Sequence, residues 1–267
     1  PAALGKLAGA QLAGFPIRHR HAYTVDREAF AIESTMVSVA ECGGGRFMSN
    51  DSPQARIHRA LTVHRLLVDP GGSGARTPPA AAHGTVALGA PASLPSVALG
   101  EVLGERRSRY RFGPLDRDRL STLLGWALGP GRTTAAPNGP PRTLRLNPSA
   151  GGLDSLDVHL VVLRRIGDIA VGTCVFEPSA HVLHRTGTGP CVEALGSCLV
   201  QPQFAARASV FVVLAGRLDK TLVKYTERHY RTLHVDAGIA AQNLYLVSTA
   251  LELAGCAVSG FYDDHIA

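Results

Sequence analysis

The sequence predicts an α+β fold, in which strands and long helices do not alternate in a regular order. Three runs, 156–166, 169–178 and 209–218, are rich in branched residues, which favours strands. The segment 232–254 is apolar almost all the way round a helix, which favours a long buried helix. The sequence lacks the repeated β-α-β spacing that would predict a parallel, doubly wound sheet.

The first part of the chain is predicted to form a separate small module. Residues 22–35 alternate like a strand, and residues 54–68 carry apolar side chains at helical spacing. A stretch rich in Gly, Pro and Ala follows, which is typical of a linker. We therefore expect an α+β module at 1–70, a linker at 71–95 and a larger domain at 96–267.

The larger domain is expected to begin with two helices. One lies within 97–112 and leads into a basic turn, and the other lies at 114–129. A stretch rich in Pro and Gly at 130–141 predicts a loop before the three strands. The long helix is expected to end near Ala254, and CAVSGF at 256–261 to form a last strand.

Composition argues against several classes of function. The formal charge of +6 permits an anionic ligand, but no basic run is interleaved with aromatic residues, so no nucleic-acid partner is expected. The five cysteines are scattered without a C-x-x-C pair, which argues against a zinc site and suits a reducing cytoplasm. Charged and amide side chains within 232–254 favour a buried helix of a soluble protein, so no membrane partner is expected either.

Two segments are suited to a phosphorylated ligand. In ERRSRYRF, 105–112, adjacent arginines and a serine after a helix could bind a phosphate through charge-assisted hydrogen bonds. In NPSAGG, 147–152, small residues would let a flat ring or a phosphate approach the main chain. The alternatives are a solvated basic turn for the first and an ordinary tight turn for the second. Neither segment matches a dinucleotide or P-loop motif.

A third segment, KYTERHYR at 224–231, gathers titratable groups at the start of the long helix. Reference pKa values of about 10 for lysine and tyrosine are too high for a base at neutral pH, so neither group serves without tuning. A lysine beside a tyrosine favours the phenolate, and partial burial strengthens that effect. The alternative is a lysine that extends to solvent and a tyrosine that packs on the sheet.

These segments, together with GTCVFEP and VSGFYDD, resemble the SagB-type (azoline) dehydrogenases of the nitroreductase superfamily. The resemblance covers roughly residue 94 to the C-terminus, and the block from 224 onward is its most specific part. It implies a nitroreductase-like α+β fold with a central, mostly antiparallel sheet flanked by helices. It also implies that the module at 1–70 is a winged-helix-like, peptide-binding segment.

The resemblance implies an FMN-dependent oxidoreductase that converts azoline rings of a ribosomally made peptide to thiazoles or oxazoles. The implied partners are the precursor peptide and cyclodehydratase subunits. A homodimer built partly on the 232–254 helix is also expected, because apolar residues surround its axis; the alternative is a helix at the centre of one domain. The alternatives are an NAD(P)H-dependent flavin reductase that acts on a small electrophile and a non-catalytic scaffold subunit of a peptide-modifying synthetase. The implied catalytic pair is Lys224 and Tyr225, with the tyrosine as base. The implied FMN contacts are Arg106, Arg107, Ser108, Tyr110, Pro148, Ser149, Ala150, Gly151, Gly152, Ser259 and Gly260.

Three features depart from the family pattern. Tyr110 stands where a second basic residue usually follows the serine, which removes a charge from the phosphate site. Asp154 and Ser155 stand where the family usually has Tyr-Pro, which alters the wall over the flavin. The family also continues beyond the G-F-x-D turn, so we expect a further C-terminal segment after Ala267.

Overall fold

The computed structural model describes residues 83–136, 139–217, 220, 225, 230–262 and 265. The expected module at 1–70 and the linker up to residue 82 lie outside these ranges, so both remain predictions.

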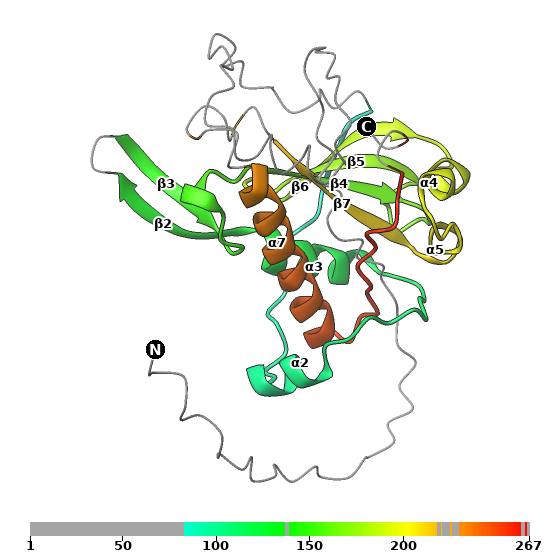
Figure 1. Cartoon of the computed structure of the whole chain (residues 1–267), viewed down its shortest axis with the longest axis horizontal. Helices are drawn as coiled ribbons and strands as arrows, with labels where there is room; N and C mark the ends of the chain where they lie inside the picture. The colour runs from blue at the N-terminus through cyan, green and yellow to red at the C-terminus, as the bar shows by residue number, and fades with distance from the viewer. Residues whose placement is uncertain are drawn as a thin grey trace, which may run out of the picture.

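A five-stranded sheet forms the centre of the molecule (Figure 1). Its strands lie in the order β1-β6-β5-β4-β7, and every pairing between them is antiparallel. The strands are β1 (Thr85–Ala87), β4 (Leu156–Val162), β5 (Gly172–Glu177), β6 (Val182–Thr188) and β7 (Val210–Gly216). The predicted α+β class and the antiparallel sheet are confirmed.

Alternating side chains give the sheet two apolar faces. Leu160 of β4 and Val210 and Val212 of β7 belong to the main core. Phe211, between the two valines, belongs to a second, smaller core with Leu195. Successive side chains of a strand point to opposite faces, which explains why neighbours in β7 serve different cores.

Helices cover both faces of the sheet (Figure 1). The helices are α2 (Leu99–Glu105), α3 (Arg117–Leu128), α4 (Val192–Cys198), α5 (Gln203–Arg207) and α7 (Tyr230–Ala250). α3 and α7 pack together over the main core, where Leu124 and Leu244 are fully buried. α4 and α5 contribute Leu195 and Phe204 to the second core. α2 contacts α7 and leads into the basic turn. None of the described helices combines the length and hydropathy that crossing a bilayer requires.

The predicted loop at 130–141 is wrong. Its residues belong to a two-stranded antiparallel hairpin, β2 (Pro130–Ala136) and β3 (Gly139–Arg145), which projects from one side of the molecule (Figure 1). The hydroxyls of Thr133 and Thr143 lie 3.0 Å apart across the pair, a contact that supports the strand pairing. Proline concealed β2 because Pro130 occupies the first position of the strand, where a missing N–H is tolerated.

The predicted strand at 256–261 is also wrong. Within the described residues this segment makes only an isolated bridge, between Phe261 and Leu199. Val200 N–H donates to Gly260 O, and Tyr262 N–H to Cys198 O, both at 2.8 Å. The segment therefore runs beside the end of α4 and does not join the central sheet.

Candidate functional site

The basic turn after α2 lies against the segment that follows α7. Arg109 N–H donates to Gly255 O at 2.9 Å, which joins the two segments directly. Arg106 is half-buried, whereas Arg107 and Ser108 are exposed. The turn is thus anchored through Arg106 and Arg109 and presents a guanidinium and a hydroxyl to solvent.

Tyr245 of α7 forms a junction between these two segments. Its hydroxyl lies 2.9 Å from Ser108 Oγ and accepts the Ala257 N–H at 2.6 Å. The guanidinium of Arg106 lies 5.4 Å from the centroid of the Tyr245 ring, within the range of a cation–π contact. The Tyr245 side chain therefore contacts the basic turn twice and the segment 256–260, called the extended segment below, once.

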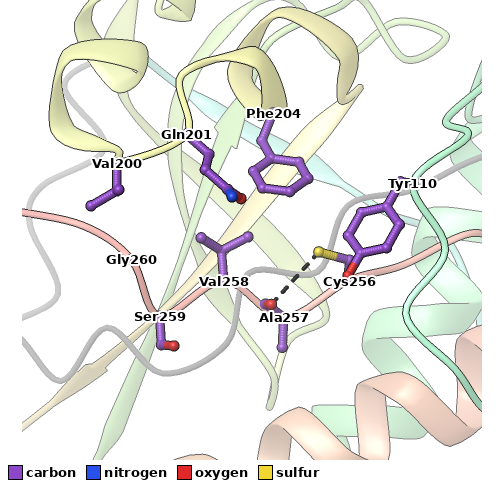
Figure 2. Close-up of a pocket in the computed structure, with 9 residues that line it drawn as sticks. All are labelled: Tyr110, Val200, Gln201, Phe204, Cys256, Ala257, Val258, Ser259 and Gly260. Atoms are coloured by element: carbon purple, nitrogen blue, oxygen red, sulfur yellow. Dashed lines mark hydrogen bonds between the residues drawn. The ribbon is translucent and has the colours of Figure 1, made fainter.

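A pocket of about 280 Å³ opens between Tyr110 of the basic turn, α5 and the segment 256–260 (Figure 2). The rings of Tyr110 and Phe204 form part of its lining, with centroids 5.9 Å apart and planes 30° apart. Ser259 and Gly260 line it from the extended segment. The structure thus brings Tyr110, Ser259 and Gly260, which are distant in the sequence, to one place.

The main chain of the extended segment offers hydrogen-bond donors to this pocket. Ala257 N–H is already bonded to Tyr245. Within the described part of the chain, the N–H groups of Val258, Ser259 and Gly260 donate to no protein group. All three residues line the pocket. Successive free amides of this kind can bind the carbonyl or ring nitrogen of a flat ligand.

The glycine loop, 148–154, adopts a conformation that favours glycine at two positions. Gly151 and Gly152 have φ of 57° and 63°, in the left-handed region. A Cβ on Gly152 would also lie 2.9 Å from Leu144 Cδ2. Asp154 has a φ of 54°, which aspartate tolerates better than most residues. The loop is therefore tightly folded around Ala150–Gly152, a single 3-10 turn.

A buried carboxylate of α7 holds the start of this loop. Asp236 is only 4% exposed, and its two oxygens lie 3.1 and 3.0 Å from Ala150 N, which donates to them. Burial raises the pKa of Asp236, the Ala150 N–H bond opposes that shift, and the charge of Asp154 adds to it. The carboxylate is thus committed to the loop and faces a neighbouring like charge.

Basic side chains hold the rest of the loop. Arg142 of β3 donates to the carbonyl of Gly152, and Arg145 forms an ion pair of 2.5 Å with Asp154. Lys220 Nζ donates to Asp154 O at 2.9 Å. Charged groups of β3 and α7, together with Lys220, therefore hold the glycine loop in place.

In the described part of the chain, the glycine loop and the basic turn are attached to α7 at different places. They attach to α7 at Asp236 and Tyr245, nine residues apart. That separation is about 2.5 helical turns, so the two side chains leave opposite sides of the helix, about 13 Å apart along its axis. The pocket beside Tyr110 contains no residue of the glycine loop.

The expected catalytic pair is described only in part. Tyr225 is half-buried. Lys224 lies outside the described residues, so the pairing of the two side chains remains a prediction. No group of His, Cys, Asp and Glu side chains suited to a metal ion occurs among the residues that the structure describes.

Sequence reasoning missed several residues of the site. Tyr245 could have been noticed, because it is an aromatic hydroxyl in the C-terminal half of the long, largely apolar helix. Arg142 directly follows the predicted loop at 130–141, where no strand was expected. Phe204 lies on α5, which had no sequence signal of its own.

Comparison with known proteins gives a consistent picture for this part of the chain. The model of the nitroreductase family matches residues 103–267. A Methanocaldococcus jannaschii protein that carries the name nitroreductase is 29% identical over 175 residues, which cover 65% of this chain and 84% of that protein.

Three solved structures are similar at lower identity. A nitroreductase structure from Ralstonia eutropha shares 21% identity with a TM-score of 0.49, and covers 62% of this chain and 72% of its own. A nitroreductase structure from Anabaena variabilis shares 23% identity with a TM-score of 0.46. The match covers 49% of this chain and only 27% of the Anabaena chain. The Escherichia coli microcin synthetase complex with a truncated precursor bound shares 20% identity with a TM-score of 0.42. The match covers 77% of this chain and 70% of the chain from the complex.

Proposed function

The chain belongs to the nitroreductase family, and we propose that it is an FMN-dependent dehydrogenase that oxidises azoline rings of a ribosomally made peptide to thiazoles or oxazoles. The observation that best supports a flavin site is the junction at Tyr245, where the basic turn meets the extended segment. The resemblance in sequence assigns both of these segments to FMN. It also narrows the reaction from the family's oxidoreductase chemistry to azoline oxidation.

The residues present fit FMN. Arg107 and Ser108 offer an exposed guanidinium and a hydroxyl, and the half-buried Arg106 adds a second positive charge, which together suit a phosphate dianion. The free amides of Ser259 and Gly260 suit the polar edge of the isoalloxazine ring, and the pocket beside them has an aromatic lining. No dinucleotide loop occurs in the sequence, so the mononucleotide is the better match.

FMN, when bound, supplies the hydride acceptor for the reaction. The protein must hold the azoline ring, remove its acidic Cα proton and exclude water. We assign proton removal to Tyr225 Oη, with Lys224 favouring the phenolate through its charge. Tyr225 Oη would take up the ring proton, bound FMN would supply the two-electron acceptor, and molecular oxygen would serve as the final electron acceptor.

We propose that the working unit is a homodimer. The glycine loop is assigned to FMN but is attached to the side of α7 that faces away from the Tyr245 junction. A second copy could bring its glycine loop to the basic turn of the first. Exposed apolar side chains of α2 (Leu99 and Leu103) and of α7 (Val235) are available for such an interface.

Residues 1–70 and the partner proteins complete the proposal. We assign the leader of the precursor peptide to the module at 1–70, and cyclodehydratase subunits to the surface around it. This assignment rests on the sequence resemblance. Deleting residues 1–70 should lower turnover on a full precursor more than turnover on a leaderless ring substrate; equal losses contradict it.

Turnover tests the proposed reaction. The purified protein, incubated with an azoline-containing peptide and oxygen, should produce a peptide lighter by two hydrogens per ring, detected by mass spectrometry.

The second candidate function is an NAD(P)H-dependent flavin reductase of a small electrophile, which the name of the Methanocaldococcus relative favours. Rapid bleaching of the bound flavin by NADH or NADPH, with no loss of hydrogen from the peptide, would select that candidate.

A further inference from the structure

Tyr245 touches two segments that the proposed function assigns to FMN, although its own ring does not line the pocket. We propose that the Tyr245 hydroxyl is a positioning group, which fixes Ser108 for the phosphate and the 257–260 amides for the flavin ring at the same time. This inference rests on the proposed function, because it takes FMN as the ligand.

The hydrogen bonds at the hydroxyl fix its role. Ala257 N–H can only donate, so Tyr245 Oη accepts that bond, at 2.6 Å. The phenol hydrogen is then available for Ser108 Oγ, 2.9 Å away. A phenol is a better donor than an aliphatic hydroxyl because it is more acidic, so Ser108 acts as the acceptor. This direction leaves the hydrogen of Ser108, which is exposed, free to donate to an anionic ligand.

The ring of Tyr245 adds a second constraint on the same turn. Arg106 lies 5.4 Å from the ring centroid, and a cation over an aromatic face is held by the charge distribution of the ring. Phenylalanine in place of Tyr245 would keep this contact and remove only the two hydrogen bonds. The substitution therefore separates the hydroxyl from the ring.

A purely structural tyrosine and a positioning tyrosine give different binding results. If the hydroxyl merely stabilised the fold, its loss would lower the melting temperature and leave ligand selectivity unchanged. If it positions Ser108, its loss should weaken FMN more than riboflavin, because riboflavin lacks the phosphate. Riboflavin should still weaken slightly, because Ala257 loses its acceptor.

The test is a set of binding titrations on the full chain, with flavin fluorescence as the signal. Tyr245→Phe should weaken FMN about tenfold, the effect of losing one or two hydrogen bonds, and riboflavin by less than about threefold. Ser108→Ala should weaken FMN and leave riboflavin unchanged. In the double variant the Ser108→Ala effect should shrink, because the two groups act through one bond. Tyr262→Phe is the matched control: it removes a hydroxyl from a half-exposed ring beside His265 and should change neither affinity.

The outcomes separate the two proposals. If the wild-type protein binds no FMN, the proposed function fails, and this inference fails with it. If the wild type binds FMN and Tyr245→Phe binds both flavins as tightly, only the inference is overturned. It is also overturned if the effects of the two substitutions simply multiply. Should Tyr245→Phe fail to fold, Ser108→Ala still decides, since equal losses for FMN and riboflavin would contradict the assigned role of its hydroxyl.

Discussion

The two ends of α7 hold their neighbouring loops in different ways. Near the N-terminal end, buried Asp236 and the basic groups of Arg142 and Arg145 bond the glycine loop, so that charge fixes its shape. Toward the other end, the neutral hydroxyl of Tyr245 anchors the basic turn and leaves the donors of Arg107 and Ser108 exposed. The difference shows that side chains of the protein itself hold the glycine loop in shape, whereas the basic turn keeps exposed hydrogen-bond donors that a ligand can use.

The largest expected effect lies at neither end. The loops at both ends of α7 are assigned to FMN, whereas proton removal is assigned to Tyr225 and Lys224, which belong to neither loop. Tyr225→Phe and Lys224→Ala should each keep FMN and the fold but lose about 10²–10⁴-fold in azoline turnover, the usual cost of losing a positioned base. Turnover and flavin content measured on the same preparation check this. Wild-type turnover with flavin intact would remove that residue from the mechanism.

The next effect is on stability at the Asp236 end. Asp236→Ala leaves the partly buried Ala150 N–H without its acceptor and should lower the free energy of unfolding by about 1–3 kcal/mol. Asp118→Ala, at an exposed position of α3, is the control and should change it by less than about 0.5 kcal/mol. Urea denaturation of both variants measures the difference. Similar losses for the two variants would mean that Asp236 does not hold the loop.

The same carboxylate makes a prediction about pH. Burial raises the pKa of Asp236 in the folded protein, so its stabilising contribution is full below its unfolded pKa and is lost as pH rises through its folded pKa. Asparagine keeps an acceptor for Ala150 and does not titrate. Asp236→Asn should therefore gain stability relative to the wild type as pH rises from 4 toward 7. Melting temperatures of the two proteins across this range test it, and a difference that stays constant or reverses would contradict it.

The smallest effect belongs to the ion pair of Arg145 and Asp154. Both side chains are partly exposed, so solvent screens their interaction. Arg145→Met should lower the free energy of unfolding by no more than about 1 kcal/mol. A loss as large as that of Asp236→Ala would show that the surface pair, and not the buried carboxylate, dominates this end of α7.

The sequence allowed prediction of the elements with strong periodicity. The strands near β4, β5 and β7 and the helices α3 and α7 follow local patterns of branched and apolar residues. The hairpin β2–β3 was missed because its exposed strands bury no apolar face and contain proline and glycine. The Tyr245 and Asp236 contacts join residues that are far apart in sequence, so spacing alone could not pair them. That the glycine loop and the basic turn use opposite sides of α7 likewise required the packed structure.

The identity of the bound cofactor tests the central claim most directly. The freshly purified protein should absorb visible light as a flavoprotein, and heat should release a ligand with the mass of FMN. Arg106→Ala with Arg107→Ala should lose that ligand, because the two guanidinium groups assigned to the phosphate are removed, although Arg109 and Arg111 remain in the turn. Release of FAD, or the absence of flavin from the folded wild-type protein after incubation with FMN, would contradict the account.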